Sequence, residues 1–170
     1  MKLLALTGCR RQEIGSLLWM DINFDSGVMT IPGERTKNGR TLDLGLPSVV
    51  LEILRVAPRR RGYIFGTRGV GFSSWSTATA ALRSRIAVPL APWTLHDIRR
   101  TVATGIAELG IQPHVVEAIL NHQSGHKAGV AGIYNKAGYV REIAAALAQW
   151  AEHVTAVVEG RENKVVPLRA

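Results

Sequence analysis

Cysteine is almost absent from this sequence of 170 residues, in which Cys9 is the only one. A single cysteine excludes an intrachain disulfide and a metal cluster held by several thiolates. The sequence therefore favours a reducing compartment, and we expect a cytoplasmic protein.

Long hydrophobic runs are also missing, because a Glu, Arg or His interrupts every apolar stretch before it could span a bilayer. The segment Leu6-Thr7-Gly8-Cys9 resembles a bacterial lipoprotein cleavage box. The apolar run before it is far too short for a signal peptide, however, and Arg10 and Arg11 follow at once. We expect neither export nor a membrane partner. The sequence contains no internal repeat and no low-complexity segment.

Acidic residues are scarce: 13 Asp and Glu stand against 21 Lys and Arg, which gives a formal net charge of +8. Sixteen of the basic residues are arginine, the side chain best suited to binding phosphate with two hydrogen bonds. This composition favours a polyanionic partner, although a basic protein without such a partner would have the same net charge.

The chain length and the hydrophobic content of 46% predict one domain with a hydrophobic core.

The apolar periodicity predicts a mainly α-helical fold with a small three-stranded antiparallel β-sheet. Two helical pieces should meet at Thr7-Gly8, and two turn sequences should separate the strands, so that Lys37 lies near the second turn. The strands are expected at residues 22–24, 28–31 and 41–46, and the helical segments at 3–19, 48–57, 74–87, 94–109, 113–121 and 139–158. Residues 58–68 should form a solvated basic loop. The last helix should present an apolar core stripe formed by Ile143, Leu147, Trp150, Val154 and Val157.

Several polar side chains stand inside these otherwise apolar segments. His96 and Arg99 are three residues apart on a predicted helix, so both could contact the same phosphate. Arg10 should be half-buried, which requires either a partner such as Glu13 or a bound anion. Each also has an ordinary interpretation, namely a solvated helix face for the first pair and an internal ion pair for Arg10.

Lys37, His122 and Tyr134 are less distinctive when they are considered singly. Lys37 at a hairpin tip would ordinarily be a surface lysine, yet a mobile ammonium there could protonate a leaving oxygen. His122 could simply cap the C-terminus of a helix. A tyrosine that follows an isoleucine is more often in a core, but the glycines and polar residues around Tyr134 favour an accessible segment.

Taken together, these residues supply cations, proton donors and a nucleophile, which are the groups that a tyrosine needs to attack a phosphodiester. The six are Arg10, Lys37, His96, Arg99, His122 and Tyr134. No carboxylate pair or histidine cluster has the spacing of metal ligands, so a metal site and a metal-dependent nuclease lack support.

Five short motifs contain these residues and follow one another along the chain. They are Thr-Gly-x-Arg-x-x-Glu at residues 7–13, a lysine in a β-turn, His-Asp-Ile-Arg-Arg-Thr at 96–101, Leu-Asn-His at 120–122 and Tyr-Asn-Lys at 134–136. In this order they resemble the catalytic domain of the tyrosine recombinases, or phage-type integrases, as found in prophages and genomic islands. The resemblance extends from Leu3 to about Trp150.

The resemblance implies how the site would bind its substrate. Arg10 and Arg99 would hold the non-bridging oxygens of the scissile phosphate, with Glu13 steadying Arg10. His122 would complete the phosphate pocket. The implied substrate is double-stranded DNA.

The resemblance also implies a reaction. Tyr134 would attack to form a 3′-phosphotyrosyl link, with His96 as the candidate general base and Lys37 as the general acid toward the leaving 5′ hydroxyl. A 5′ hydroxyl of another strand would then resolve the link, so neither a metal, ATP nor another cofactor is implied. Tyr139 is the alternative nucleophile, but its distance in sequence from His122 is further from the family pattern.

The sequence departs from the family pattern between Asn121 and Tyr134. Asn121 stands where a glycine usually precedes the histidine, and the interval from His122 to Tyr134 is a few residues longer than usual. The additional residues can be accommodated in a loop around Ser124-Gly125-His126.

We expect residues 1–170 to form one catalytic domain that begins almost at the first arginine motif, without the N-terminal DNA-clamping domain of the family. The expected function is site-specific DNA recombination and integration for a bacterial or phage-borne mobile element. The resemblance implies a tetramer on DNA for a full-length enzyme, whereas this chain alone should be a monomer in solution. Two alternatives stay open: a DNA-binding remnant that does not cleave, and a type IB topoisomerase that relaxes DNA.

Overall fold

The computed structural model describes residues 1–59, 62–67, 69–122 and 136–162 of the chain. The first two helices are α1 (Lys2–Thr7) and α2 (Arg11–Gly15), which confirms the two helical pieces expected there. Gly8 ends α1 with φ of 65°, and its N–H donates to the Leu4 carbonyl. A Cβ at this position would lie 3.0 Å from Val102, so both the turn and the close packing require glycine.

The predicted three-stranded antiparallel sheet is present in the order β1-β2-β3, with β1 (Ile22–Asn23), β2 (Val28–Ile31) and β3 (Leu42–Gly45). Ile22 pairs with Met29, which in turn pairs with Leu44, and all three side chains are buried. This alternation places one face of the sheet on the core. Lys37 lies in the connection between β2 and β3, as expected.

A second, two-stranded ribbon formed by β4 (Gly66–Thr67) and β5 (Val70–Gly71) was not expected from the sequence. Part of it falls in residues 58–68, for which the prediction was a solvated loop. The ribbon is rich in glycine and has no alternation of apolar residues, so little in the sequence indicated it. Directly after β5, the Phe72 N–H donates to the Gly15 carbonyl at 2.8 Å. The Arg59 guanidinium in the basic run lies 4.1 Å from the Trp19 ring centre, a cation–π contact.

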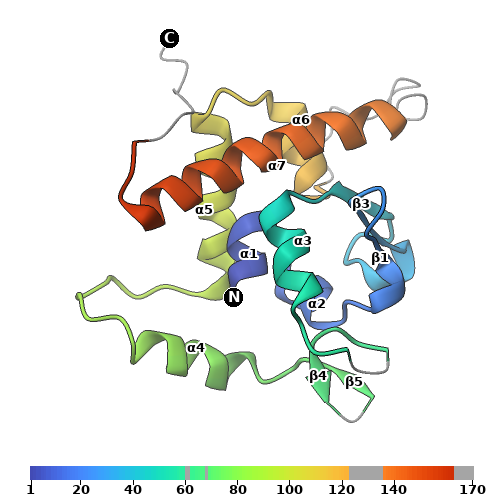
Figure 1. The fold of residues 1–170 in the computed structure, drawn as a ribbon. Coiled ribbons are helices and arrows are strands. Elements are labelled where there is room, and N and C mark those ends of the chain that lie inside the picture. The colour runs from blue at the N-terminus through green and yellow to red at the C-terminus, as the bar shows by residue number, and fades with distance from the viewer. Residues whose placement is uncertain (60–61, 68, 123–135, 163–170) are drawn as a thin grey trace.

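The remaining helices are α3 (Ser48–Arg55), α4 (Trp75–Arg83), α5 (Leu95–Glu108), α6 (Pro113–Ile119) and α7 (Lys136–Glu159). Helix α4 ends at Arg83, four residues earlier than expected. Beyond Arg83, the side chains of Ser84, Arg85 and Ala87 are exposed, so little packing stabilises a further helical turn. Figure 1 shows α4 standing apart from the body of α1, α3 and α5.

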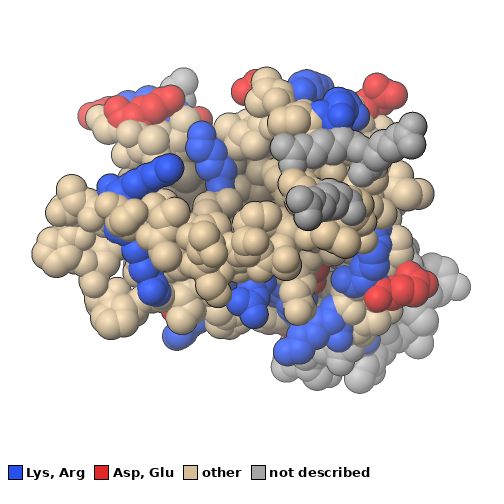
Figure 2. Space-filling model, turned by 90° about the horizontal axis from the view of Figure 1, so that it is seen from below, with Lys and Arg blue, Asp and Glu red and all other residues tan. Residues whose placement is uncertain are grey.

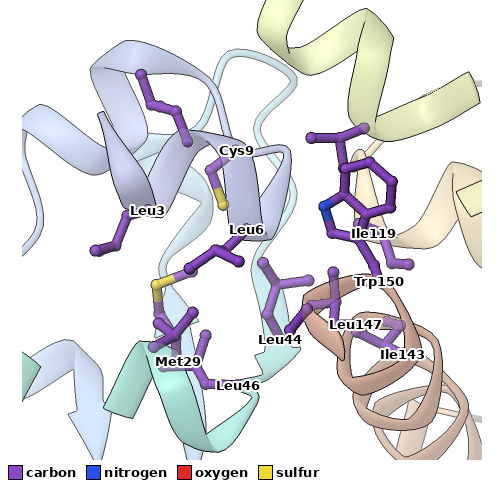
Figure 3. Packing of buried hydrophobic residues seen from close by; sticks show 14 of the residues in the cluster. Leu3, Leu6, Cys9, Met29, Leu44, Leu46, Ile119, Ile143, Leu147 and Trp150 are labelled. Carbon is purple, nitrogen blue, oxygen red and sulfur yellow. The ribbon is translucent and has the colours of Figure 1, made fainter. Parts of the chain in front are cut away.

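Helix α7 crosses the molecule and packs against β3, α6, α1 and α5 (Figure 1). Figure 3 shows Ile143, Leu147 and Trp150 of α7 directed toward Leu44 of β3 and Ile119 of α6. The predicted apolar stripe is therefore confirmed at these three positions and at Val154, which is partly buried and packs against the core. Val157 is an exception: its side chain is 67% exposed while that of Ala156 is fully buried, so a different side of α7 is covered at this end. Among the described residues, no helix has the length and apolar content needed to cross a membrane.

Candidate active site

Glu13 holds Arg10 through both of its carboxylate oxygens. Oε2 accepts the Arg10 backbone N–H at 2.7 Å, and Oε1 accepts the Arg10 Nη1–H at 2.8 Å. The Glu13 side chain is 2% exposed, whereas that of Arg10 is 22% exposed. The ion pair weighed from the sequence is therefore present, and it still leaves part of the guanidinium accessible to a ligand.

Arg99 is buried on α5, where only 5% of the residue is exposed. Its Nη1–H donates to the Gly8 carbonyl at 2.6 Å, and its Nη2–H donates to the Leu120 carbonyl. Burial lowers the pKa of Arg99, and the nearby Arg10 charge lowers the pKa further. An arginine nevertheless stays protonated in proteins, so two positive charges stand close together here.

A cleft of about 650 Å³ lies between α4 and the N-terminal ends of α2 and α5. It brings together four of the six candidate residues, which come from three separate segments of the chain: Arg10, Lys37, and His96 with Arg99 on α5. Among the described residues that line it, none is Asp or Glu. The cleft therefore suits an anionic ligand, and the N-terminal end of the α5 dipole adds to its positive potential.

His96 and Lys37 reach the cleft from exposed positions. His96 lies in the first turn of α5 and is exposed, while Arg99, one turn later, is buried. Lys37 is exposed in the connection between β2 and β3. The cleft thus has a buried arginine in its wall and an exposed histidine and lysine at its opening.

His122 lies just past the C-terminus of α6 and is not among the residues that line the cleft. Its backbone N–H donates to the Glu117 carbonyl at 3.0 Å, so it does follow the helix end as expected. Burial lowers the pKa of His122, and the Arg99 charge lowers the pKa further, while Glu117 opposes this. These influences indicate that His122 lies within electrostatic reach of both Arg99 and Arg10.

The two candidate nucleophiles are Tyr134 and Tyr139, and the structure describes Tyr139 alone. Tyr134 lies outside the described residues. Tyr139 is a half-buried residue of α7 that packs on the core, and its ring makes an edge-to-face contact with His114 of α6, with 5.9 Å between the ring centres. A tyrosine held in this way contributes to packing between α6 and α7.

Sequence reasoning missed two features of this site. Arg11 and Arg83 also line the cleft, and α4 forms one wall through Trp75 and Thr79. No sequence signal links α4 to the candidate residues, because its apolar spacing is that of any amphipathic helix. The second feature is a contact between Asn38 and Asn121, for which the unusual asparagine before His122 was the only sign.

Seen from the side of α4, β4 and β5, Lys and Arg side chains are distributed over the face, while Asp and Glu lie mostly toward its edges (Figure 2). Among the described residues, no group of three or more His, Cys, Asp and Glu side chains is placed to hold a metal ion. The arrangement can bind and polarise a phosphodiester through arginine and lysine.

Comparison with known proteins gives a consistent result. The model of the phage integrase family matches residues 1–139. Two Escherichia coli K12 proteins are similar over most of this chain: Prophage integrase IntZ is 28% identical over 171 residues, which is 98% of this chain, and Prophage integrase IntA is 27% identical over 161 residues, which is 91% of it. This chain covers 42% and 38% of these two proteins, less than half of their length.

A solved structure shares the fold. The integrase from mycobacterium phage Brujita superposes with a TM-score of 0.64 and 22% sequence identity. The superposition covers 86% of this chain and 48% of that protein.

Proposed function

This chain belongs to the phage integrase family of tyrosine recombinases, and from that premise we propose that it cleaves and rejoins double-stranded DNA at a specific site. One observation carries the proposal: Arg10, Lys37, His96 and Arg99 line a single cleft in which no described lining residue is acidic. Phosphoryl transfer without a metal requires such a concentration of positive charge around the phosphate.

Arg10 and Arg99 bind the two non-bridging oxygens of the scissile phosphate. Arg99 is fixed by two backbone carbonyls and Arg10 by Glu13, so both guanidiniums are held in place before DNA arrives. Preorganised charges of this kind stabilise the transition state without reorganisation. His122 completes the phosphate pocket from the end of α6.

Tyr134 is the nucleophile. Its hydroxyl oxygen forms a bond to phosphorus while the bond from phosphorus to the 5′ oxygen breaks. His96 accepts the tyrosine proton and Lys37 gives a proton to the leaving 5′ oxygen. A 5′ hydroxyl of another strand reverses these steps, so the reaction exchanges one phosphodiester for another and consumes no cofactor.

The substrate and assembly follow from the same premise. The partner is double-stranded DNA, and the complete enzyme acts as a tetramer on it, whereas residues 1–170 constitute a catalytic domain that is monomeric without DNA. The similarity to prophage integrases supports recombination over relaxation by a type IB topoisomerase. A bacterial or phage-encoded protein of the cytoplasm fits this role.

The test is a covalent-complex assay with a nicked duplex from the end of the mobile element, in which the released fragment diffuses away and traps the adduct. Wild-type protein should yield a DNA-linked band on a denaturing gel. Tyr134→Phe should abolish the band and keep DNA binding in a gel shift, because only the nucleophilic oxygen is removed.

Tyr139→Phe is the matched control and should retain the adduct. An adduct that persists in Tyr134→Phe and disappears in Tyr139→Phe would reassign the nucleophile. The chain can also be tested after fusion to the N-terminal DNA-clamping domain of an integrase. Salt-sensitive DNA binding without an adduct in both forms would indicate a DNA-binding remnant.

A further inference from the structure

Asn121 has an unusual backbone conformation, with φ of 46°, and it is the only non-glycine residue with positive φ in the described part of the chain. Asparagine tolerates this left-handed region better than other side chains with a Cβ. A glycine would adopt the same backbone without strain. The backbone therefore explains why the position accepts Gly or Asn, but it does not explain what the asparagine side chain contributes.

The Asn121 side chain and backbone hold the connection between β2 and β3. Asn38 Nδ2–H donates to the Asn121 carbonyl at 2.6 Å and lies 3.1 Å from Asn121 Oδ1. Asn121 Nδ2–H donates to the Arg40 carbonyl at 3.1 Å. These contacts join two segments that are 83 residues apart in the sequence.

Within the connection, the same residues organise the backbone around Lys37. Asn38 Oδ1 accepts from the Thr36 hydroxyl at 3.2 Å and lies 3.3 Å from the Arg40 backbone nitrogen. The Thr36 hydroxyl also lies 2.8 Å from the Arg40 carbonyl. Lys37 thus stands between two tied residues, and its own long side chain is exposed.

The three residues at the end of α6 each connect to a different part of the site. The Leu120 carbonyl accepts from Arg99, and Asn121 binds the connection that carries Lys37. His122 follows immediately. One turn of backbone therefore sets the positions of a phosphate-binding arginine, a histidine and the lysine loop relative to one another.

We propose that Asn38 and Asn121 are positioning residues that keep Lys37 within reach of the leaving 5′ oxygen. This inference rests on the proposed function of Lys37 as general acid. With glycine at position 121, the hydrogen bond to the carbonyl would remain, but both contacts of the Asn121 side chain would be lost. A loop that keeps one of these three described contacts with Asn121 would sample more conformations, and fewer of them would present the ammonium to the phosphate.

The experiment compares two leaving groups in single-turnover cleavage, using a nicked duplex with either oxygen or sulfur at the 5′ bridging position. A thiolate leaves without a proton because a thiol ionises near pKa 8.5, so sulfur removes the need for the general acid. Asn121→Gly and Asn38→Ala should each cleave the oxygen substrate roughly 10- to 100-fold more slowly than wild type, the loss expected from a misplaced catalytic group. Both variants should cleave the sulfur substrate within about threefold of the wild-type rate, with unchanged DNA binding.

Two controls show whether the defect belongs to this contact. Asn23→Ala removes a similar asparagine, which caps the β1–β2 turn by accepting from the Asp25 and Ser26 backbone N–H groups, and it should leave both rates unchanged. The double variant Asn38→Ala/Asn121→Gly should lose less than the product of the two single losses, because both substitutions remove the contact between Asn38 Nδ2 and Asn121 Oδ1. Equal losses on both substrates, additive losses, or unchanged rates would each overturn the proposal.

A measurement without DNA separates this inference from the proposed function. In Asn121→Gly, ¹⁵N relaxation should show the order parameters of the Lys37 and Gly39 amides falling from about 0.85 toward 0.6 or below, while those of β2 and β3 stay unchanged. Unaltered order parameters would overturn the positioning role whether or not the wild-type protein forms an adduct. A missing wild-type adduct, with the loop loosened as expected, would instead count against the proposed function alone.

Discussion

Arg99 donates a 2.6 Å hydrogen bond to the carbonyl of Gly8, a residue 91 positions earlier in the chain. Its second hydrogen bond, to Leu120, brings the end of α6 to the same guanidinium. The end of α1, the N-terminal part of α5 and the end of α6 are therefore joined by one side chain. A residue proposed to grip the phosphate also holds the fold together, so the two contributions have to be measured separately.

Arg99→Lys keeps a positive charge but loses the planar fork that reaches two carbonyls at once. The free energy of unfolding should fall by about 1–3 kcal/mol, the cost of leaving a buried acceptor unpaired. Urea denaturation measures this change. Arg100→Lys is the control on the same helix, because its side chain is 74% exposed, and it should change stability by less than about 0.5 kcal/mol. Equal effects of the two substitutions would contradict the structural role of Arg99.

Glu13→Gln should lower the free energy of unfolding by about 1–3 kcal/mol. Both carboxylate oxygens of Glu13 accept from Arg10, and glutamine would place an NH₂ donor opposite one of these two donors. The buried position of Glu13 means that water cannot replace the lost acceptor. Equilibrium unfolding in urea again provides the measurement. Gln12→Ala, at an exposed position next to Glu13, should be nearly neutral. A neutral result for Glu13→Gln would mean that Arg10 is held by other contacts.

The pKa of His122 should lie below the ordinary value of 6.5, because burial and the Arg99 charge both disfavour its protonated form. The unfolded chain then binds more protons than the folded protein as the pH falls below 6.5, so this residue's contribution to stability is present above that pH and is lost below it. NMR titration, with His122→Asn to assign the resonance, measures the pKa. Inorganic phosphate in the cleft should raise the pKa of His122, and a pKa at or above 6.5 without phosphate would contradict this prediction.

Gly105→Ala should destabilise the protein even though alanine is favoured over glycine in a helix by about 1 kcal/mol. A Cβ at this position would lie 2.2 Å from the Trp150 ring. That ring is buried and anchored by its Nε1–H to the Ala5 carbonyl at 2.7 Å, so it cannot move aside without cost. We expect a net loss of about 1–3 kcal/mol, measured by urea denaturation, whereas Thr104→Ala at the exposed neighbouring position should stay within about 0.5 kcal/mol of wild type. Stabilisation by Gly105→Ala would show that α5 and α7 are packed less closely.

Cys9 should be unreactive in the folded protein, although it lies next to Arg10 at the cleft. Burial raises the pKa of its thiol to about 12, so almost no thiolate exists at pH 8. Reaction with a disulfide reagent should be slow in buffer and fast in denaturing urea. Rapid modification of the native protein would mean that the base of the cleft opens to solvent.

Much of the fold could be predicted because its signals are local. The alternation around Met29 and the turn sequences specify the sheet, and the spacing of Ile143, Leu147 and Trp150 specifies the buried side of α7. The short β4–β5 ribbon was missed, since Gly66 and Gly71 pair through backbone atoms that leave no pattern of side chains. Val157 was misjudged because apolar periodicity alone does not show which side of α7 is covered at its end.

The sequence by itself determined which chemical groups are available: two arginines, a lysine, two histidines and a tyrosine in a family-specific order. Those groups are fixed by the covalent structure of the chain, and the helical and strand periodicity of the residues around them follows from local backbone geometry. Only the tertiary structure decided that Arg10, Lys37, His96 and Arg99 share one cleft, that α4 forms its wall, and that Asn38 meets Asn121. Contacts between residues that are 83 or 91 positions apart depend on how whole elements pack, and no local pattern in the chain encodes that packing.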